Sequence, residues 1–293
     1  MNFINILNHI LRPLEWVVAQ LLTLFHHALV TFGMTAGPSP AWGIAIMCLV
    51  LVIRICLLPL FLSQMRAMQR IQVLQPQIQR IQHKYAARKD PRSKEAMQRE
   101  IMALQQRYNA NPLGSCLPSL IQAPILCSLF YTLQSLPAIA DGNAEPLGGI
   151  DHTMAGGIES SSIFGVRIAD SFGTVASPQS RIIIGVAVAL MCLTLFAIQW
   201  MLIHRNTSKD AMVSPQFRVQ KMTVFVFPAI YVVSGATLPF GVLLYWLTNN
   251  LWNLGQTLCQ LRWFPTPGSA AGERKARRDY EQDNRRRAAA GLP

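Results

Sequence analysis

Five long apolar runs are the feature of this sequence that most constrains its fold. Four have 22 residues and one is shorter; the runs are 41–62, 113–134, 182–203, 222–238 and 240–261. Because a helix rises about 1.5 Å per residue, about 20 apolar residues cross the hydrocarbon core of a bilayer. Charged residues make up 14% of the chain, whereas soluble domains carry about 25%. The sequence therefore predicts an all-α polytopic membrane protein with five transmembrane helices.

A sixth apolar segment, Leu14–Phe32, has two different faces. The residues on its apolar helical face are Leu14, Val17, Val18, Leu21, Phe25, Leu29 and Phe32. The residues on the opposite face are Glu15, Ala19, Thr23, His26 and Val30. A helix of this kind lies in the membrane interface, so we expect residues 1–40 to hold an interfacial amphipathic helix on the outer face. The alternative, that this helix crosses the bilayer, stays open.

The basic residues are distributed unevenly between the connecting segments. Of the 26 Lys and Arg residues, 22 lie in three segments: 63–112, 204–221 and 262–293. By the positive-inside rule these three segments are cytoplasmic, the N-terminus is outside and the C-terminus is inside. Loop 135–181, which contains five acidic residues, is then extracytoplasmic. We expect a multi-pass membrane protein.

The cytoplasmic segment 63–112 has a helical pattern of its own. Apolar residues step by three and four as far as Tyr85, and the pattern resumes at Met97 after a break at Asp90-Pro91. Asp followed by Pro suits an N-cap and a first helical position, so the segment predicts an antiparallel helical hairpin. Ten Gln residues make its surface polar and adaptable, which favours a docking element over an inert connector. The candidate docking residues here are Gln75, Pro76, Lys84 and Arg88.

The segment 262–293 is basic, rich in small residues and predicted to be a disordered cytoplasmic tail. Its candidate docking residues are Arg277, Arg278 and Arg286. Two partners suit such a tail, ribosomal RNA and the anionic lipid headgroups of the inner leaflet. The sequence does not choose between them.

Arg54 is the most costly residue within the predicted spans. An Arg at the centre of a membrane helix costs about 2.5 to 3.5 kcal/mol on insertion scales. Arg54 precedes the end of its run by eight residues, which places its Cα about 12 Å inside the cytoplasmic boundary. None of the five runs contains Asp or Glu. We therefore expect Arg54 to attract an anionic group from another molecule.

Polar residues lie at a similar depth in the other spans, namely Gln122, Thr194 and Asn253. Asn250 lies one turn deeper, and Ser119 continues a polar stripe from Gln122 toward the cytoplasm. The outer halves of the spans are filled with Ile, Leu, Val and Phe, so water entering from the cytoplasm would meet an apolar barrier. The pattern predicts a hydrophilic groove that is open to the cytoplasm and closed to the outside. The alternative, that these polar groups only join helices through hydrogen bonds, stays open.

Motifs of common enzymes do not occur. The chain has no G-x-x-x-x-G-K-[ST], H-E-x-x-H or G-x-S-x-G sequence, and its six Cys form no C-x-x-C pair. We expect no catalytic residues, no metal site, no cofactor and no enzyme activity. A net charge of +12 would also suit a nucleic-acid partner, but the long uncharged runs argue against a DNA-binding protein.

Four motifs resemble the YidC family of membrane protein insertases. They are VIRICLLPL at 52–60, LQP at 74–76, NPLGSCLP at 111–118 followed by Gln122, and PFGVLLYW at 239–246. The resemblance implies five spans around a groove, with Arg54 and Gln122 lining it and Trp246 on the path of the incoming segment. Val50 stands where some members carry a hydroxyl. The large extracytoplasmic domain of the long bacterial form is absent, so the chain resembles the short form.

The resemblance also implies a location in the plasma (inner) membrane of a bacterium, a function and partners. The protein would be an insertase and chaperone that takes hydrophobic segments of newly made proteins into the lipid bilayer without nucleotide hydrolysis. Its expected partners are nascent membrane proteins, the ribosome, the Sec translocon and membrane lipids, and we expect a monomer. Two other hypotheses are an anion channel or transporter that uses Arg54, and a structural scaffold.

Overall fold

The computed structural model describes residues 3–87, 90–108, 110, 117–209, 211–213 and 215–291, with the side chains of 3–10, 117–120, 213, 215 and 216 left undescribed. The chain divides into two compact units. The first unit comprises 1–58, 119–195 and 227–252, and the second unit comprises 59–118, 196–226 and 253–293. Nearly all elements are α-helices, in agreement with the expected all-α class.

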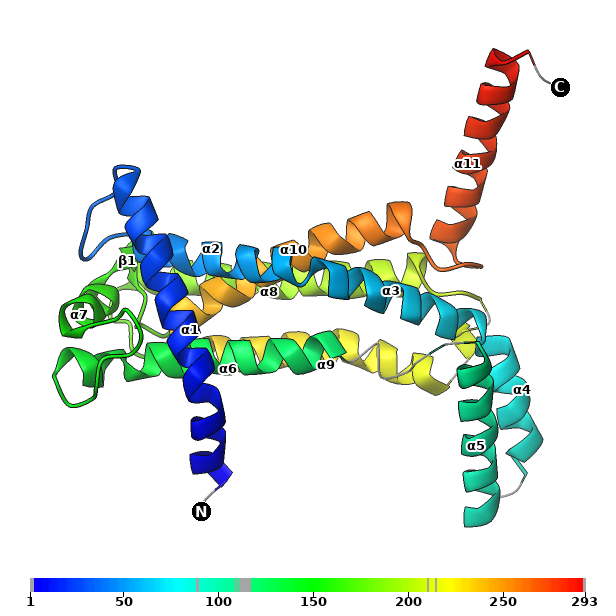
Figure 1. Cartoon of the computed structure of the whole chain (residues 1–293), viewed down its shortest axis with the longest axis horizontal. Helices are drawn as coiled ribbons and strands as arrows, with labels where there is room; N and C mark the ends of the chain where they lie inside the picture. Colours follow the sequence, from blue (N-terminus) through cyan, green and yellow to red (C-terminus); the bar gives the residue numbers. More distant parts are fainter. Residues whose placement is uncertain are drawn as a thin grey trace. The chain divides into compact units, whose positions relative to one another are not determined.

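The first unit is built from helices and one short hairpin. It holds α1 (Phe3–Thr31), α2 (Ala41–Cys56), most of α6 (Leu117–Ala140) and α7 (His152–Ser160). An antiparallel hairpin of β1 (Ser162–Ile163) and β2 (Val166–Arg167) follows α7. The helices α8 (Pro178–Arg205), α9 (Pro215–Thr237) and α10 (Phe240–Trp263) run through both units. In Figure 1, α1 lies crosswise to α2 and α6.

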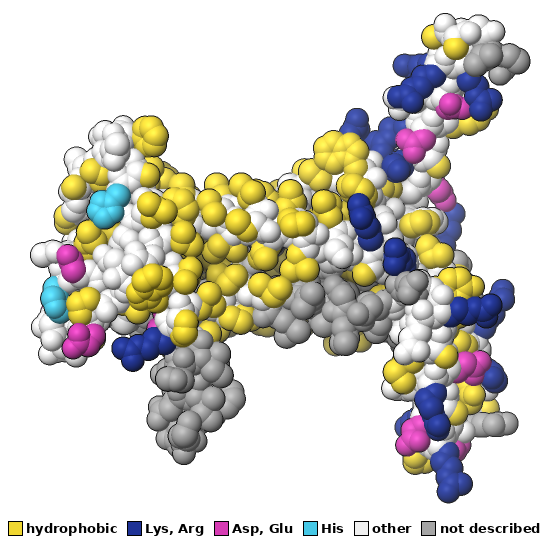
Figure 2. All heavy atoms as spheres, in the orientation of Figure 1, with side chains coloured by type: hydrophobic (Ala, Val, Ile, Leu, Met, Phe, Trp, Pro, Cys, Tyr) yellow, Lys and Arg dark blue, Asp and Glu magenta, His cyan; other side chains and the backbone are white. Residues whose placement is uncertain are grey.

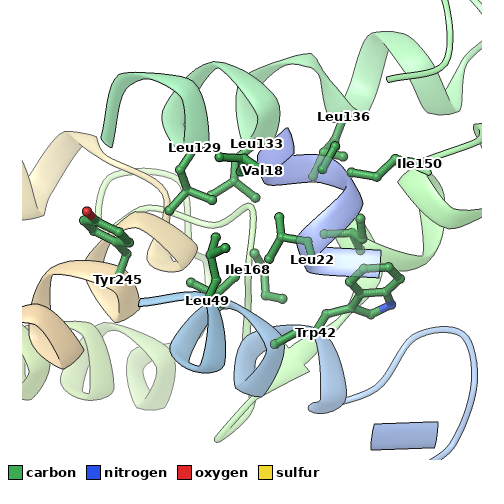
Figure 3. Packing of buried hydrophobic residues seen from close by; sticks show 14 of the residues in the cluster. Val18, Leu22, Trp42, Leu49, Leu129, Leu133, Leu136, Ile150, Ile168 and Tyr245 are labelled. Carbon is green, nitrogen blue, oxygen red and sulfur yellow. The ribbon is translucent and has the colours of Figure 1, made fainter. Parts of the chain in front are cut away.

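The core of the first unit joins α1 to three other helices (Figure 3). Leu22 of α1, Leu49 of α2, Leu129 of α6 and Tyr245 of α10 belong to one buried cluster. Each is 2% exposed or less. The face that anchors α1 differs from the expected apolar face, because Val17 and Phe32 are exposed. The residues of α1 that are 5% exposed or less are Leu11, Val18, Ala19, Leu22, Thr23 and His26. Burying an apolar side chain such as Leu22 stabilises a fold by about 1.5 to 3 kcal/mol.

The loop before α8 accepts hydrogen bonds from the first backbone N–H groups of α10. The backbone N–H of Phe240 donates to the carbonyl of Asp170 at 2.7 Å, and that of Gly241 donates to Ile168 at 2.9 Å. The first N–H groups of a helix have no partner within the helix. The loop therefore fixes the position at which α10 starts.

Among the described residues, four helices are long and apolar enough to cross a membrane, or five when a bent pair counts as one span. The four segments are Leu11–Thr31, Ile121–Ala140, Pro178–Arg205 and Phe217–Thr237, and the bent pair is α2 with α3 (Leu58–Val73). This set differs from the expected five, because it includes part of α1 and leaves out α10. The amides of α10, among them Asn249, Asn250 and Asn253, lower its mean hydropathy. That α10 is the fifth span stays a prediction.

Two predicted helices are broken near proline residues. The expected span 41–62 stops at Cys56, and α3 begins at Leu58. Proline has no N–H to donate to the preceding turn, and Pro59 follows this break directly. The expected first arm of the hairpin breaks in the same way at Leu74, just before Pro76.

The second unit contains the predicted hairpin. Its arms are α4 (Gln75–Tyr85) and α5 (Pro91–Arg107), which lie side by side in Figure 1. Asp90 caps α5, because its carboxylate accepts the N–H of Ser93 at 2.9 Å. The residues that pack between the arms are Ile71, Leu74, Ile78, Ile101, Leu104 and Ala110. The predicted N-cap and the antiparallel packing of the arms are confirmed.

The tail prediction is wrong for most of segment 262–293. Residues Ala270–Ala289 form helix α11, with the Ser269 hydroxyl accepting the N–H of Gly272 at 3.1 Å as an N-cap. Ala and Arg favour helix, and i,i+4 ion pairs add about 0.2 to 0.5 kcal/mol each. The three such pairs within α11 are Lys275–Asp279, Arg277–Glu281 and Asp283–Arg287. The high charge that suggested disorder is thus arranged at helical spacing.

Figure 2 shows that apolar side chains cover the long helices, whereas Lys and Arg gather over α4, α5 and α11. On α8 the exposed large apolar residues are Ile182, Val186, Leu190, Leu193, Phe196 and Trp200. They recur at helical spacing on one face. Such a surface suits lipid rather than water.

Candidate functional site

Arg54 makes its side-chain contacts with an amide. It lies in the last turn of α2 and is half-buried. Its Nε donates to Oδ1 of Asn249 on α10 at 2.8 Å, and its Nη2 donates to the same oxygen. No carboxylate forms an ion pair with Arg54 among the described residues. The amide orients the guanidinium but leaves its positive charge uncompensated.

Gln122 reaches the same face of α10 from α6. Its Nε2 donates to the hydroxyl of Tyr245, a residue that is 1% exposed. Tyr245 precedes Asn249 by one helical turn, so both lie on one face of α10. The structure therefore brings Arg54 and Gln122, which come from different spans, to adjacent positions along α10.

Trp246 and Asn250 occupy the neighbouring face of α10. The rings of Trp246 and Tyr231 of α9 stack with centroids 5.0 Å apart and an interplanar angle of 27°. Asn250 is 2% exposed, and its side chain lies beside the Tyr231 hydroxyl. Tyr231 thus connects two predicted site residues to α9.

Three predicted residues do not join this group. The hydroxyl of Thr194 donates to the carbonyl of Leu190 at 2.8 Å in its own helix, so it is satisfied without a partner from another element. Asn253 lies in the second unit. The side chain of Ser119 lies outside the described residues.

Sequence reasoning missed Asn249, Tyr231 and Tyr245. Asn249 is one turn from both Tyr245 and Asn253, and this spacing is visible in the sequence. The prediction, made by depth in the bilayer, named Asn253 and, one turn deeper, Asn250 instead. For Tyr231 the sequence carries no such signal, because its role depends on how α9 is rotated against α10.

A family model described as 60Kd inner membrane protein matches residues 34–266. This match covers most of the chain, including all four motifs that resemble the insertases. The chain belongs to the YidC family of membrane protein insertases. It is a multi-pass membrane protein of the bacterial cell membrane.

Relatives of the YidC family match along nearly the whole chain. The protein named membrane protein insertase YidC of Bifidobacterium longum is 43% identical over 100% of this chain and 87% of its own length. The relative of that name from Streptomyces avermitilis is 34% identical over 91% of this chain, which spans 61% of that relative. The one from Tropheryma whipplei (strain Twist) is 30% identical over 94% of this chain and 90% of its own length.

The docking residues predicted on the hairpin lie at its two ends. Gln75 and Pro76 begin α4, and Lys84 lies in its last turn. The ammonium of Lys84 pairs with Glu100 of α5 at 2.8 Å. This hydrogen-bonded pair raises the pKa of Lys84 and lowers the pKa of Glu100. Arg88 lies outside the described residues.

The predicted docking residues of the tail point in different directions on α11. Arg277 donates to Glu281 at 3.1 Å, and Arg278 donates to the backbone carbonyl of Arg262 at 2.8 Å. Arg286 is exposed. At 100° per residue these three positions fall on different sides of the helix. They do not form one contact surface.

Within the described part of the chain, no three His, Cys, Asp or Glu side chains are grouped so that they could hold a metal ion. The chemistry of the site of this YidC family member is therefore that of hydrogen-bond donors, an uncompensated cation and aromatic rings.

Proposed function

We propose that this protein is a membrane protein insertase, which moves hydrophobic segments of newly made proteins from the cytoplasm into the lipid bilayer without nucleotide hydrolysis. Membership of the YidC family supports the activity. The observation that carries the mechanism is the contact between Arg54 and Asn249. Among the described residues, this contact gives the cation inside an apolar bundle a neutral partner and no carboxylate.

The proposed path begins in a groove that opens to the cytoplasm. Arg54, Gln122, Trp246 and Asn250 line it together with Asn249. Water in this groove shortens the apolar distance that a polar or acidic tail must cross, which lowers its desolvation penalty. The guanidinium attracts the tail, because it keeps donors and charge for a carboxylate or for peptide carbonyls.

Release into lipid requires no separate source of energy. The arriving hydrophobic helix passes Trp246 and leaves sideways into the bilayer, driven by burial of its own apolar surface. The apolar outer halves of the helices block a continuous aqueous path. This arrangement suits insertion better than solute transport.

The proposed orientation places the N-terminus outside and the C-terminus in the cytoplasm. The hairpin of α4 and α5 then projects into the cytoplasm, where Gln75, Pro76, Lys84 and Arg88 serve as a docking surface for the ribosome and the Sec translocon. Nascent membrane proteins are the substrates, and the protein acts as a monomer. The arginines of α11 face either ribosomal RNA or lipid.

Reconstitution in liposomes tests the mechanism. The substrate is a short membrane protein with an acidic tail, and a version with a neutral tail is the control. We expect Arg54→Ala to lower insertion of the acidic version about tenfold while the neutral version changes less, since a charge-assisted hydrogen bond contributes about 1.5 to 3 kcal/mol. Arg54→Lys should retain part of the activity, because the charge remains but the planar fork is lost.

Equal insertion by Arg54→Ala and the parent protein would contradict the electrostatic mechanism. Anion flux through the same liposomes, without insertion, would support the channel hypothesis instead. Absence of both activities would leave the scaffold hypothesis.

A further inference from the structure

The chain that follows α10 is held in place by side chains of the second unit. Gln69 of α3 donates to the backbone carbonyls of Phe264 and Pro265 at 2.6 Å and 3.1 Å. The N–H of Thr266 donates to Oδ1 of Asn206 at 2.9 Å, and Thr266 is 1% exposed. The turn between α10 and α11 is therefore a structured elbow with buried, satisfied backbone groups.

This elbow sets the direction of α11. In Figure 1, α11 runs crosswise to the last turns of α10. Arg278 of α11 donates to the carbonyl of Arg262, in the last turn of α10, at 2.8 Å. A cation is favourable there, because the C-terminal end of a helix carries unsatisfied carbonyls and partial negative charge. The side of α11 that holds Arg278 thus faces the end of α10.

Two more arginines share that side of α11. At 100° per residue, Arg274, Arg278 and Arg285 fall within 40° of one another, and we name them the basic stripe. Arg274 and Arg285 are exposed and form no ion pair with any residue that the structure describes. Glu281 adjoins the stripe, but its carboxylate is engaged by Arg277.

The rest of the helix surface carries charges of both signs. Lys275 pairs with Asp279 at 3.6 Å, and Arg287 pairs with Asp283 at 2.9 Å. Lys209 adds a contact to Glu273 at 3.7 Å. Four arginines of α11 form no ion pair among the described residues; three belong to the basic stripe, and the fourth, Arg286, lies 80° to 120° away from them around the helix.

Aromatic side chains mark the level at which α10 ends. Trp263 is 56% exposed and Phe264 is 37% exposed. Tryptophan prefers the headgroup level of a bilayer, because its ring is apolar while its N–H can meet water. A helix that starts seven residues after Trp263 and runs crosswise to α10 follows the membrane surface.

We propose that α11 lies on the inner membrane surface and binds anionic lipid headgroups through Arg274, Arg278 and Arg285, with Trp263 at the interface. Phosphate oxygens are suitable acceptors for guanidinium groups. Ribosomal RNA is the less suitable partner, because outside the stripe every basic residue of α11 except Arg286 is paired with a carboxylate. The elbow, the stripe and the aromatic residues all fit one flat anionic surface.

Hydrogen exchange of the full chain in nanodiscs tests this proposal. The discs contain either phosphatidylcholine alone or phosphatidylcholine with phosphatidylglycerol, and exchange is followed in peptides from 270–289. The stripe variant is R274Q/R278Q/R285Q, and the matched control is K275Q/R286Q/R287Q, which removes the same charge from other sides of the helix and leaves the Arg277–Glu281 pair intact. The readout is the ratio of the exchange rates in the two kinds of disc, measured for each protein. A substitution that changes helix stability equally in both discs does not alter this ratio.

We expect phosphatidylglycerol to slow exchange at least about tenfold in the parent, since each basic residue near an anionic surface adds attraction. The control should keep most of this effect, whereas the stripe variant and added salt should remove it. Equal exchange in both lipids, or equal loss in both variants, would overturn the proposal. Cosedimentation with ribosomes is the second arm: loss of ribosome binding in the stripe variant without any lipid effect would assign the stripe to RNA.

Discussion

The guanidinium of Arg54 is oriented by a partner that cannot neutralise it. Asn249 accepts two hydrogen bonds from Arg54 through a single amide oxygen. A carboxylate at this position would give a stronger interaction and would cancel the charge. The neutral acceptor therefore leaves the cation available for a substrate, which is the central requirement of the proposed mechanism.

Replacing Asn249 with Asp tests this requirement at a single atom. The two side chains have nearly the same shape, so Asn249→Asp should preserve the contact while creating an internal ion pair. We expect insertion of an acidic-tailed substrate to fall about as far as in Arg54→Ala, roughly tenfold, because the substrate competes with the new carboxylate. Insertion in reconstituted liposomes is the measurement.

The control is Asn249→Gln, which keeps a neutral acceptor and should retain more activity than Asn249→Asp. If Asn249→Asp inserts the acidic substrate as well as the parent does, Arg54 does not act through its charge.

The contact between Gln122 and Tyr245 is also open to measurement. Tyr245→Phe removes the hydroxyl that accepts from Gln122 and leaves the amide of Gln122 without this partner. In a double-mutant cycle with Gln122→Leu, we expect a coupling free energy of about 0.5 to 1.5 kcal/mol. Unfolding of the four proteins in mixed micelles provides the values. A coupling near zero would show that the two side chains do not interact in the membrane.

At the scale of the element, the hairpin of α4 and α5 depends on pH through one exposed ion pair. The pKa of Glu100 is lowered by its hydrogen bond to Lys84, and the pKa of Lys84 is raised by the same bond. The contribution of Glu100 to stability is present above its unfolded pKa of about 4.3 and is lost as pH falls through the lowered value. That of Lys84 is present below about 10.4 and is lost as pH rises through the raised value.

Between these limits the pair should stabilise the hairpin equally at every pH. We expect amide protection in 75–107, corrected for intrinsic exchange, to fall between pH 6 and pH 3. The fall should be small, because exposed ion pairs contribute little. Lys84→Met should show less of this fall, since nothing then lowers the pKa of Glu100 through this bond. The same fall in Lys84→Met and in the parent would assign it to other carboxylates.

Helix α10 carries much of the candidate site although its composition is too polar to mark it as a membrane span. It carries Asn249, Asn250 and Trp246, and its amides keep it out of the set of helices that are apolar enough to cross a membrane on their own. Its position in the first unit is nevertheless fixed by buried contacts, among them Tyr245 and Val242. Polar residues in a membrane helix are tolerated when they face neighbouring helices or water inside the bundle.

At the scale of the whole molecule, the placement of α1 decides on which side the N-terminus lies. Residues Leu11–Thr31 are apolar enough to cross the bilayer, but α1 packs crosswise to α2 and α6 (Figure 1). A helix that lies in the interface runs crosswise to those that span the membrane. The packing therefore supports the interfacial placement.

Labelling with a membrane-impermeant thiol reagent in intact cells tests this placement. In a background without the native cysteines, we expect Arg12→Cys and Ala36→Cys to be labelled from outside. Ala288→Cys should be labelled only after the membrane is permeabilised. If Arg12→Cys also required permeabilisation while Ala36→Cys did not, α1 would cross the bilayer.

The sequence by itself determined the all-α membrane class, the approximate positions of α6, α8 and α9, the N-cap of α5 and the family, along with Arg54 as a costly cation. These features depend on local composition and spacing along the chain. Only the tertiary structure decided that Asn249 is the partner of Arg54, a residue 195 positions away, and that Tyr231 and Tyr245 join the site. It also decided the crosswise position of α1. The reason is that contacts between helices depend on how each helix is rotated and packed against the others, and a one-dimensional pattern does not specify those rotations.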